Sequence, residues 1–244
     1  LAVLATAFGG PSLAQDKTGW PESLTIGTAS QGGTYFIYGT GLANLISEEL
    51  GINASGEVTG GPVQNATLVQ TGDHGMGLVT MGPAYEAWTG VSELAPGLEH
   101  KDLRALFPMY QTPFQVVALA SSGIDDVSDL DGKRVAVGPA GGTAATYWPR
   151  FFEIVGVSPE VSFAGANDAV SQVKDGLIDA FAFAAGVPIA AFAQIAAEND
   201  VTIFAFTPDQ QSAILAERPE LAAYDIPGGL YDGFPDAQPT IALW

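Results

Sequence analysis

The sequence of 244 residues contains no cysteine, only two histidines and few basic residues. Without cysteine the chain can form neither disulfides nor thiolate zinc sites, and it has no thiol nucleophile. Its 8 lysines and arginines stand against 27 acidic residues, which gives a net charge of −19. Because nucleic-acid binding needs clustered basic side chains, this balance argues against a nucleic-acid partner. It indicates an acidic surface that favours solubility.

Long hydrophobic runs are also absent. Apolar residues make up 47% of the chain and charged residues 14%, which is typical of a folded globular protein. The apolar run at 1–8 is too short to span a bilayer, which takes about 20 residues. Small residues at Ser12 and Ala14 fit the cleavage rule of export signals. The sequence therefore predicts that residues 1–14 are the remnant of a signal cleaved near Ala14, that the protein is periplasmic, and that both ends of the chain are clipped.

A strand, a glycine-rich turn and a helix follow one another near the start of the chain. An apolar run at 24–26 leads into the turn Gln31-Gly32-Gly33-Thr34, and the apolar residues after it are spaced as in a helix. A second strand-like segment ends in the pair Gly60-Gly61, and a helix is predicted over 63–71. Bare backbone at strand ends, beside the N-terminus of a helix, suits an oxygen-rich ligand.

The same pattern recurs about a hundred residues later, the span of one small lobe. VAVGPAGGT mirrors LTIGTASQGGT, and 168–188 mirrors 65–83 in its order of helix, glycine, apolar strand and proline. Alternating short strands and helices predict mainly parallel sheets with ligands beyond the strand ends. We therefore predict an α/β protein with lobes at 24–108 and 113–203 that face each other across a cleft. Residues 204–244, with a short helix at 221–224, are predicted to return towards the first lobe, their C-terminal part missing.

Catalytic motifs are not evident. Neither glycine turn has the lysine of a phosphate-binding loop or the glycine spacing of a dinucleotide fingerprint. His74 and His100 lie in polar connecting segments and are predicted to be surface residues, and no pair of carboxylates stands out as an acid–base couple. The sequence predicts neither a cofactor nor a metal, and it favours a binding protein over an enzyme.

A recognition surface between the lobes is the remaining interpretation. Backbone N–H groups of the two turns can hold a carboxylate, helped by the positive ends of the helices. Tyr35 and Phe183 are either apolar walls of this site or ordinary core residues. Arg150, the one cation near the second turn, is interpreted as a surface residue. The predicted ligand-binding residues are Gln31, Gly33, Thr34, Tyr35, Thr59, Asn65, Gln115, Gly141, Gly142, Thr143, Phe183 and Gly186.

The chain resembles the TAXI family, the extracytoplasmic solute receptors of TRAP transporters, in five ordered segments: LTIGTASQGGTYFIYGTGLANLI, VTGGPVQN, TGDHGMGLVTMGPAYEAW, DLDGKRVAVGPAGGT and KDGLIDAFAFAAGVP. The resemblance implies a two-lobed periplasmic binding-protein fold of type II, with crossover strands between the lobes. It implies a receptor without chemistry of its own, which binds a small organic acid or amino acid (a dicarboxylate or a glutamate-like ligand) and delivers it to fused membrane subunits. We expect a monomer. The positions carried over add Gly32 and Gly60 to the predicted site.

Two residues depart from the pattern of that family. Pro62 stands where the family typically has serine, and Gly82 where it often has aspartate. Without that aspartate, the site lacks a carboxylate that could bind an amino group of the ligand. This favours a ligand that is recognised by its own carboxylate and needs no amino group. Three alternatives stay open: a solute-binding protein of an ABC importer, a periplasmic sensor domain, and an enzyme built on the same scaffold.

Overall fold

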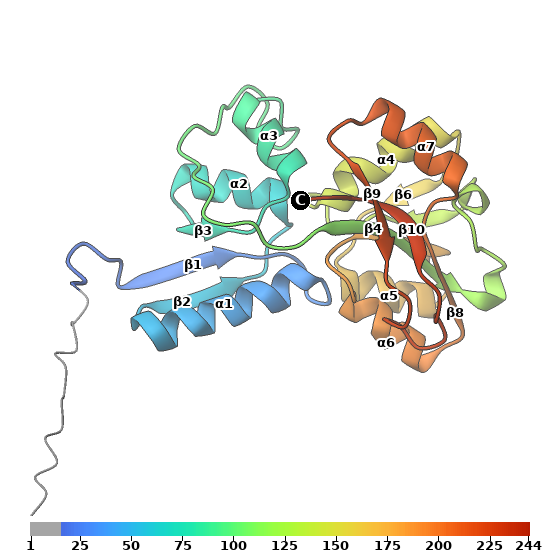
Figure 1. The fold of residues 1–244 in the computed structure, drawn as a ribbon, viewed down its shortest axis with the longest axis horizontal. Helices are drawn as coiled ribbons and strands as arrows, with labels where there is room; N and C mark the ends of the chain where they lie inside the picture. Colours follow the sequence, from blue (N-terminus) through green and yellow to red (C-terminus); the bar gives the residue numbers. More distant parts are fainter. Residues whose placement is uncertain (1–15) are drawn as a thin grey trace, which may run out of the picture.

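The computed structural model describes residues 16–244 and arranges them in two α/β lobes (Figure 1). The chain crosses from the first lobe to the second through residues 103–111, which have no regular secondary structure. The predicted remnant of an export signal at 1–14 lies outside the described residues. Within 16–244, every helix is too short or too polar to cross a membrane.

The first lobe is built on a three-stranded parallel sheet in the order β2-β1-β3. Its hydrophobic core is small and centres on Ile26, Tyr35 and Leu78. Helix α2 begins at Pro62, whose fixed backbone angle suits the first position of a helix. The elements of this lobe are β1 (Ser23–Gly27), α1 (Thr34–Leu50), β2 (Asn53–Glu57), α2 (Pro62–Thr71), β3 (Met76–Gly77) and α3 (Met81–Thr89).

The second lobe contains a seven-stranded mixed sheet in the order β6-β5-β7-β4-β10-β9, with β8 also paired to β4. Strands β5, β6 and β7 are parallel, as predicted, whereas β4 is antiparallel to β7, β8 and β10. The prediction of mainly parallel sheets is therefore wrong around β4. The elements of this lobe are β4 (Thr112–Leu119), the 3₁₀ turns η1 (Ala120–Ser122) and η2 (Val127–Leu130), β5 (Arg134–Ala136), α4 (Thr143–Val155), β6 (Glu160–Ser162), α5 (Ala166–Lys174), β7 (Ala180–Ala184), α6 (Ala190–Glu198), β8 (Val201–Phe204), α7 (Pro208–Glu217), β9 (Ala222–Ile226) and β10 (Gln238–Leu243).

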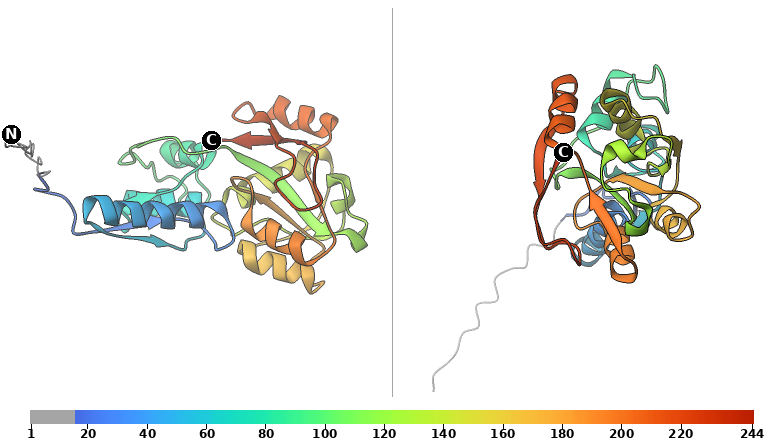
Figure 2. Two further views of the ribbon diagram at one scale, coloured as in Figure 1. Left: turned by 60° about the horizontal axis from the view of Figure 1, so that its bottom comes forward. Right: turned by 90° about the vertical axis from the view of Figure 1, so that its right-hand side faces the viewer.

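Most of the segment 204–244 packs on the second lobe instead of returning to the first. Strand β10 pairs with both β9 and β4, and the chain reaches the junction of the lobes only at its last residue (Figure 2). There the carbonyl of Trp244 accepts a hydrogen bond from the Met81 N–H. The helix predicted at 221–224 is wrong, because pairing with β10 holds this stretch as the extended strand β9.

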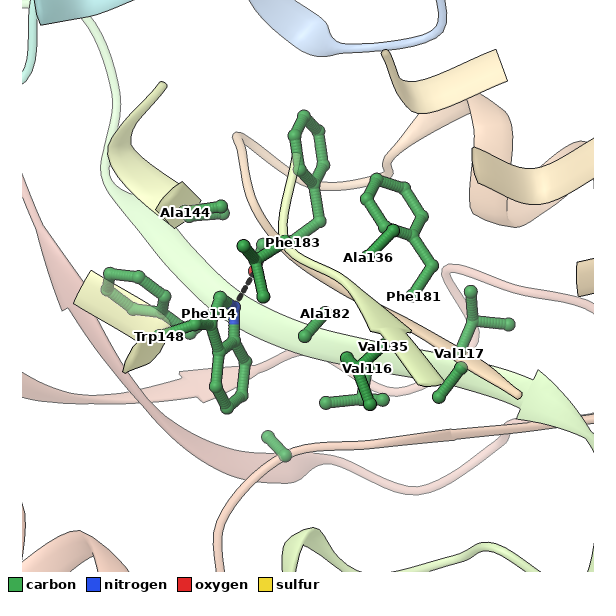
Figure 3. Packing of buried hydrophobic residues seen from close by; sticks show 14 of the residues in the cluster. Phe114, Val116, Val117, Val135, Ala136, Ala144, Trp148, Phe181, Ala182 and Phe183 are labelled. Atoms are coloured by element: carbon green, nitrogen blue, oxygen red, sulfur yellow. Dashed lines mark hydrogen bonds between the residues drawn. The ribbon is translucent and has the colours of Figure 1, made fainter. Parts of the chain in front are cut away.

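Aromatic residues form the centre of the second lobe (Figure 3). Helix α4 buries Ala144, Tyr147, Trp148, Phe151 and Phe152, which recur at the spacing of one helical face. Their rings pack against the central strand, so the start of α4 is held firmly beside the ends of β4 and β7.

Candidate functional site: a cavity between the lobes

A cavity of about 30 Å³ lies where the two lobes meet. Its walls come from both glycine turns, from the first residues of α1 and α4, and from the facing ends of β4 and β7. The volume has room for about two water molecules. None of the described residues that line it is charged. They are Ala29, Gly33, Thr34, Tyr35, Gly60, Gly61, Pro62, Thr112, Pro139, Gly142, Thr143, Phe183, Ala184 and Ala185.

Two helices, one from each lobe, point their N-termini at this cavity. Gly33 and Gly142 are their N-cap residues, and neither helix receives a hydrogen bond from a capping side chain. The N–H groups of these glycines are used within their own turns: Gly33 donates to the Ser30 carbonyl (3.2 Å) and Gly142 to that of Pro139 (2.8 Å). The donors that remain for a ligand are the first-turn N–H groups of α1 and α4, which have no partner inside their helices.

The structure brings one group of predicted site residues together around the cavity. Tyr35 and Phe183 form apolar walls and are only 8% and 6% exposed. They also belong to the hydrophobic cores of their lobes, so each ring is both a wall of the cavity and a core residue. The predicted residues that line the cavity are Gly33, Thr34, Tyr35, Gly60, Gly142, Thr143 and Phe183.

Gln31 and Gly32 lie outside the lining and connect the lobes through their backbone carbonyls. The Gln31 carbonyl accepts a hydrogen bond from the Asn167 N–H (3.3 Å), and that of Gly32 accepts one from the Ala191 N–H (3.1 Å). Asn167 and Ala191 stand in the first turns of α5 and α6, whose N–H groups need such acceptors. This turn of the first lobe therefore caps two helices of the second.

Gly141 and Gly186 also serve contacts between the lobes. The Gly141 carbonyl accepts a hydrogen bond from the Val63 N–H (3.0 Å), and the Gly186 carbonyl accepts one from the Thr34 hydroxyl. Neither glycine lines the cavity. Both help to hold the lobes together around it.

Asn65 and Thr59 have a structural role inside the first lobe. The fully buried Asn65 amide donates to the carbonyls of Gly27 (3.1 Å), Thr28 (2.7 Å) and Leu78 (2.8 Å), and its oxygen accepts from the Thr59 hydroxyl (2.7 Å). The side chain thus joins the ends of β1 and β3 to the turn before α2. With both its amide nitrogen and its oxygen hydrogen-bonded inside the lobe, it is a positioning residue for the site.

Replacing Asn65 with aspartate is expected to lower the free energy of unfolding by about 2–4 kcal/mol. The carboxylate keeps the shape of the side chain but faces three carbonyl oxygens to which it cannot donate. Asn44→Asp on the exposed face of α1 is the matched control and should change stability by less than about 0.5 kcal/mol. Urea unfolding measures both, and equal midpoints for Asn65→Asp and the unaltered protein would contradict the assigned role.

Gln115, a further predicted site residue, is fully buried in β4 and does not reach the cavity. Its side-chain oxygen accepts a hydrogen bond from the Tyr231 hydroxyl (2.9 Å), and that hydroxyl accepts one from the Ile189 N–H (2.9 Å). Burial raises the pKa of Tyr231 to about 12. Gln115 therefore anchors the residues just before α6.

Both histidines are buried, so the prediction that they lie on the surface is wrong. The ring of His100 is 3.0 Å from the Thr67 hydroxyl and 2.9 Å from the Leu98 carbonyl. The ring of His74 is 3.3 Å from a carboxylate oxygen of Glu57. Neither lines the cavity. Among residues 16–244, acidic and histidine side chains form no group of three that could hold a metal ion.

Arg150, predicted to be a surface residue, joins the lobes at one side of the cavity. Its guanidinium in α4 is 2.8 Å from the carboxylate of Glu86 in α3. Burial opposes the charge of Arg150, but hydrogen bonding and attraction to Glu86 outweigh burial and raise its pKa. The hydroxyls of Thr80, the N-cap residue of α3, and Thr143, the first residue of α4, are 2.7 Å apart and form a second contact between the lobes.

Arg150→Met is expected to weaken ligand binding about two- to five-fold, because the lost ion pair joins the lobes. Arg134→Met is the matched control, since Arg134 pairs with Asp179 (2.6 Å) inside the second lobe alone. It should reduce stability slightly and leave the affinity unchanged. Titration calorimetry at low and high salt measures both effects, and an equal loss of affinity in the two variants would contradict a role specific to the junction.

The prediction from the sequence missed several residues that line the cavity. Thr112 begins β4 and is 2% exposed, Ala184 ends β7 and is followed by Ala185, and Pro139 precedes the second glycine turn. The repeat of the glycine turns was a signal for Pro139, since it lies in the mirrored segment. For the small residues at the ends of β4 and β7 the sequence carries no such signal, because only the antiparallel pairing of these strands places them side by side.

Solved structures with the same two-lobed arrangement confirm the predicted fold class. The ligand-binding core of GluR0 in complex with L-glutamate is 14% identical, with a TM-score of 0.50 over 81% of this chain and 94% of that chain. An ancestral arginine-binding protein bound to arginine is 17% identical, with a TM-score of 0.54 over 91% and 84%. The alkanesulfonate-binding protein SsuA from Xanthomonas axonopodis pv. citri bound to MOPS is 15% identical, with a TM-score of 0.52 over 91% and 65%. The fold is therefore the two-lobed periplasmic binding-protein fold of type II.

The family is shown by the sequence as a whole. A model of the NMT1-like family matches residues 26–244, which contain both glycine turns and every residue that lines the cavity. The protein belongs to the NMT1-like family.

Proposed function

We propose that this protein is a periplasmic solute receptor that binds a small organic acid or amino acid between its lobes. The observation that carries the proposal is the convergence of the N-termini of α1 and α4 on one cavity. Two positive helix ends with free N–H groups favour a carboxylate even without an arginine. No cofactor, metal or catalytic group is needed for this role.

Binding is coupled to the approach of the lobes, because each lobe supplies one of the two helix ends. A ligand held by α1 alone lacks half of its donors until α4 reaches it. The contacts of Gln31, Gly32, Gly141 and Gly186 then add hydrogen bonds between the lobes. A ligand that makes more contacts in the closed arrangement shifts the population of the protein towards it.

We further propose that the receptor delivers its ligand to the membrane subunits of a TRAP transporter. The support is the resemblance of the two glycine turns and the segments around them to the TAXI receptors. The second candidate, a receptor of an ABC importer or a sensor domain, uses the same fold. Uptake by the reconstituted system separates the candidates. Transport driven by an ion gradient without ATP supports the TRAP receptor, ATP-dependent transport supports the ABC receptor, and ligand binding without any uptake supports the sensor domain.

A thermal-shift screen of organic acids and amino acids tests ligand binding itself. A ligand present at a hundred times its Kd is expected to stabilise the protein by about 2.7 kcal/mol, with a saturable rise in Tm. Absence of any shift across the panel would contradict the proposed function. Conversion of the bound compound by the purified protein would favour the enzyme alternative.

A further inference from the structure

Among the threonines that line the cavity, one has a hydroxyl whose hydrogen-bonding capacity is unused. Three threonines line the cavity, and two of them have partners: Thr34 donates to the Gly186 carbonyl and Thr143 bonds to Thr80. The Thr112 hydroxyl is buried, and within residues 16–244 it has no hydrogen-bond partner. A buried hydroxyl without a partner is unfavourable unless something in the cavity meets it.

The surroundings of Thr112 do not supply that partner. The Thr112 hydroxyl lies close enough to Tyr35 to affect it: burial raises the pKa of Tyr35, and the contact with Thr112 opposes this shift only in part. The contact falls short of a regular hydrogen bond, since Thr112 Oγ1 is still unpaired. Thr112 stands at the first position of β4, where the chain enters the second lobe, and it is one of the residues that line the cavity.

The remaining walls limit the size and the charge of the ligand that the cavity can hold. Apart from the helix starts they are apolar or bare backbone, from Ala29 and Pro62 on one lobe and Pro139, Ala184 and Ala185 on the other. A volume of about 30 Å³ has room for about two water molecules, so the smallest carboxylates enter with the least separation of the lobes. A second carboxylate would be buried here without a cation, and an ammonium group without a carboxylate, and burying an unpaired charge is strongly unfavourable.

We propose that the ligand is a short monocarboxylate of about two or three carbon atoms, without an amino group and with an oxygen on its second carbon. Its carboxylate faces the N-termini of α1 and α4, and its hydroxyl or keto oxygen bonds to Thr112. The inference rests on the proposed function and narrows it, because it separates this chain from receptors of dicarboxylates and glutamate-like ligands.

Titration calorimetry with the unaltered protein is the first test. L-Lactate or pyruvate is expected to bind about tenfold or more tightly than propionate, which lacks the second oxygen. L-Alanine, succinate and L-glutamate are expected to bind at least about a hundredfold more weakly than the best probe. Tighter binding of succinate, L-alanine or L-glutamate would overturn the inference and leave the proposed function intact. If none of these compounds nor any other acid in the screen binds, both fail.

The variants Thr112→Val and Thr112→Ser form the second test. Valine keeps the shape of threonine without the hydroxyl, so it is expected to lower the affinity for L-lactate or pyruvate about 5- to 100-fold and to leave that for propionate unchanged. Serine keeps the hydroxyl and is expected to retain most of the discrimination. An equal loss for propionate and L-lactate in Thr112→Val would assign Thr112 a structural role and overturn the inference. If Thr112→Val does not fold, the ratio of affinities in the unaltered protein and in Thr112→Ser decides.

Discussion

Replacing Gly61 with alanine is expected to reduce ligand affinity by at least about thirtyfold. Gly61 has a φ of +112° and a ψ of −161°, a conformation that is essentially restricted to glycine, and other residues there cost about 1–3 kcal/mol. An added Cβ would stand 3.0 Å from the Gly142 Cα and 3.2 Å from the Gly141 carbonyl oxygen, both in the other lobe. These are backbone atoms, so the contact can be relieved only by moving the lobes apart.

Gly60→Ala is the matched control for this prediction. An added Cβ at Gly60 would be 3.5 Å from Gly141 and 2.9 Å from the side-chain oxygen of Gln64, which accepts a hydrogen bond from the Gly60 N–H (2.6 Å). This oxygen ends a long side chain, so it can move aside without moving the lobes. The φ of Gly60 is not positive, so alanine is compatible with the backbone. Its affinity is expected to fall no more than about threefold. Calorimetry with the best acid of the screen measures both variants, and equal effects would contradict the geometry of the junction.

The second large effect is expected from Trp148→Ala, which should lower the free energy of unfolding by about 3–5 kcal/mol. The ring is fully buried, and its centroid lies 5.1 Å from that of Phe206 and 5.4 Å from that of Phe152 in stacked arrangements. The indole N–H donates to the Phe183 carbonyl (3.1 Å), as the dashed line in Figure 3 marks. Because Phe183 lines the cavity, this bond also sets one wall of the site.

Two controls separate the contributions of Trp148. Trp148→Phe keeps most of the ring and loses the N–H donor, so an intermediate loss of about 1–2 kcal/mol is expected, together with weaker ligand binding. Trp88→Ala removes a tryptophan that is 42% exposed in the first lobe and should cost less than about 1 kcal/mol. Denaturant unfolding followed by circular dichroism measures all three variants. A Trp148→Ala protein as stable as Trp88→Ala would show that the aromatic cluster does not carry the stability of the second lobe.

Local signals in the sequence located the glycine turns and most helices well. The helix predicted at 63–71 is observed as α2, Pro62–Thr71, because proline, glycine and apolar spacing act within a few residues. The helix predicted at 221–224 failed for the opposite reason: β9 is specified by its pairing with β10, a contact that no local pattern reports. The antiparallel orientation of β4 likewise depends on its pairing with β7, a strand that is distant in the sequence.

The same distinction between local and long-range signals applies to the residues of the candidate site. Turn glycines such as Gly33 and Gly142 were identified because their spacing recurs in the chain. Asn65 and Gln115 were predicted to meet a ligand, but they bond to buried protein groups. The sequence does not show which group a polar side chain will form a hydrogen bond with. That partner can stand more than a hundred positions away, as Tyr231 does from Gln115.

The sequence by itself determined that thiol chemistry is excluded, that the surface is acidic, and that a strand–glycine turn–helix unit occurs twice. These properties follow from composition and short-range spacing. Only the tertiary structure decided which polar groups are used between the lobes and which threonine of the cavity, Thr112, has no hydrogen-bond partner within residues 16–244. The physical reason is that hydrogen-bond partnership and enclosure depend on residues brought together by folding, whereas turns and helix ends depend on their neighbours in the chain.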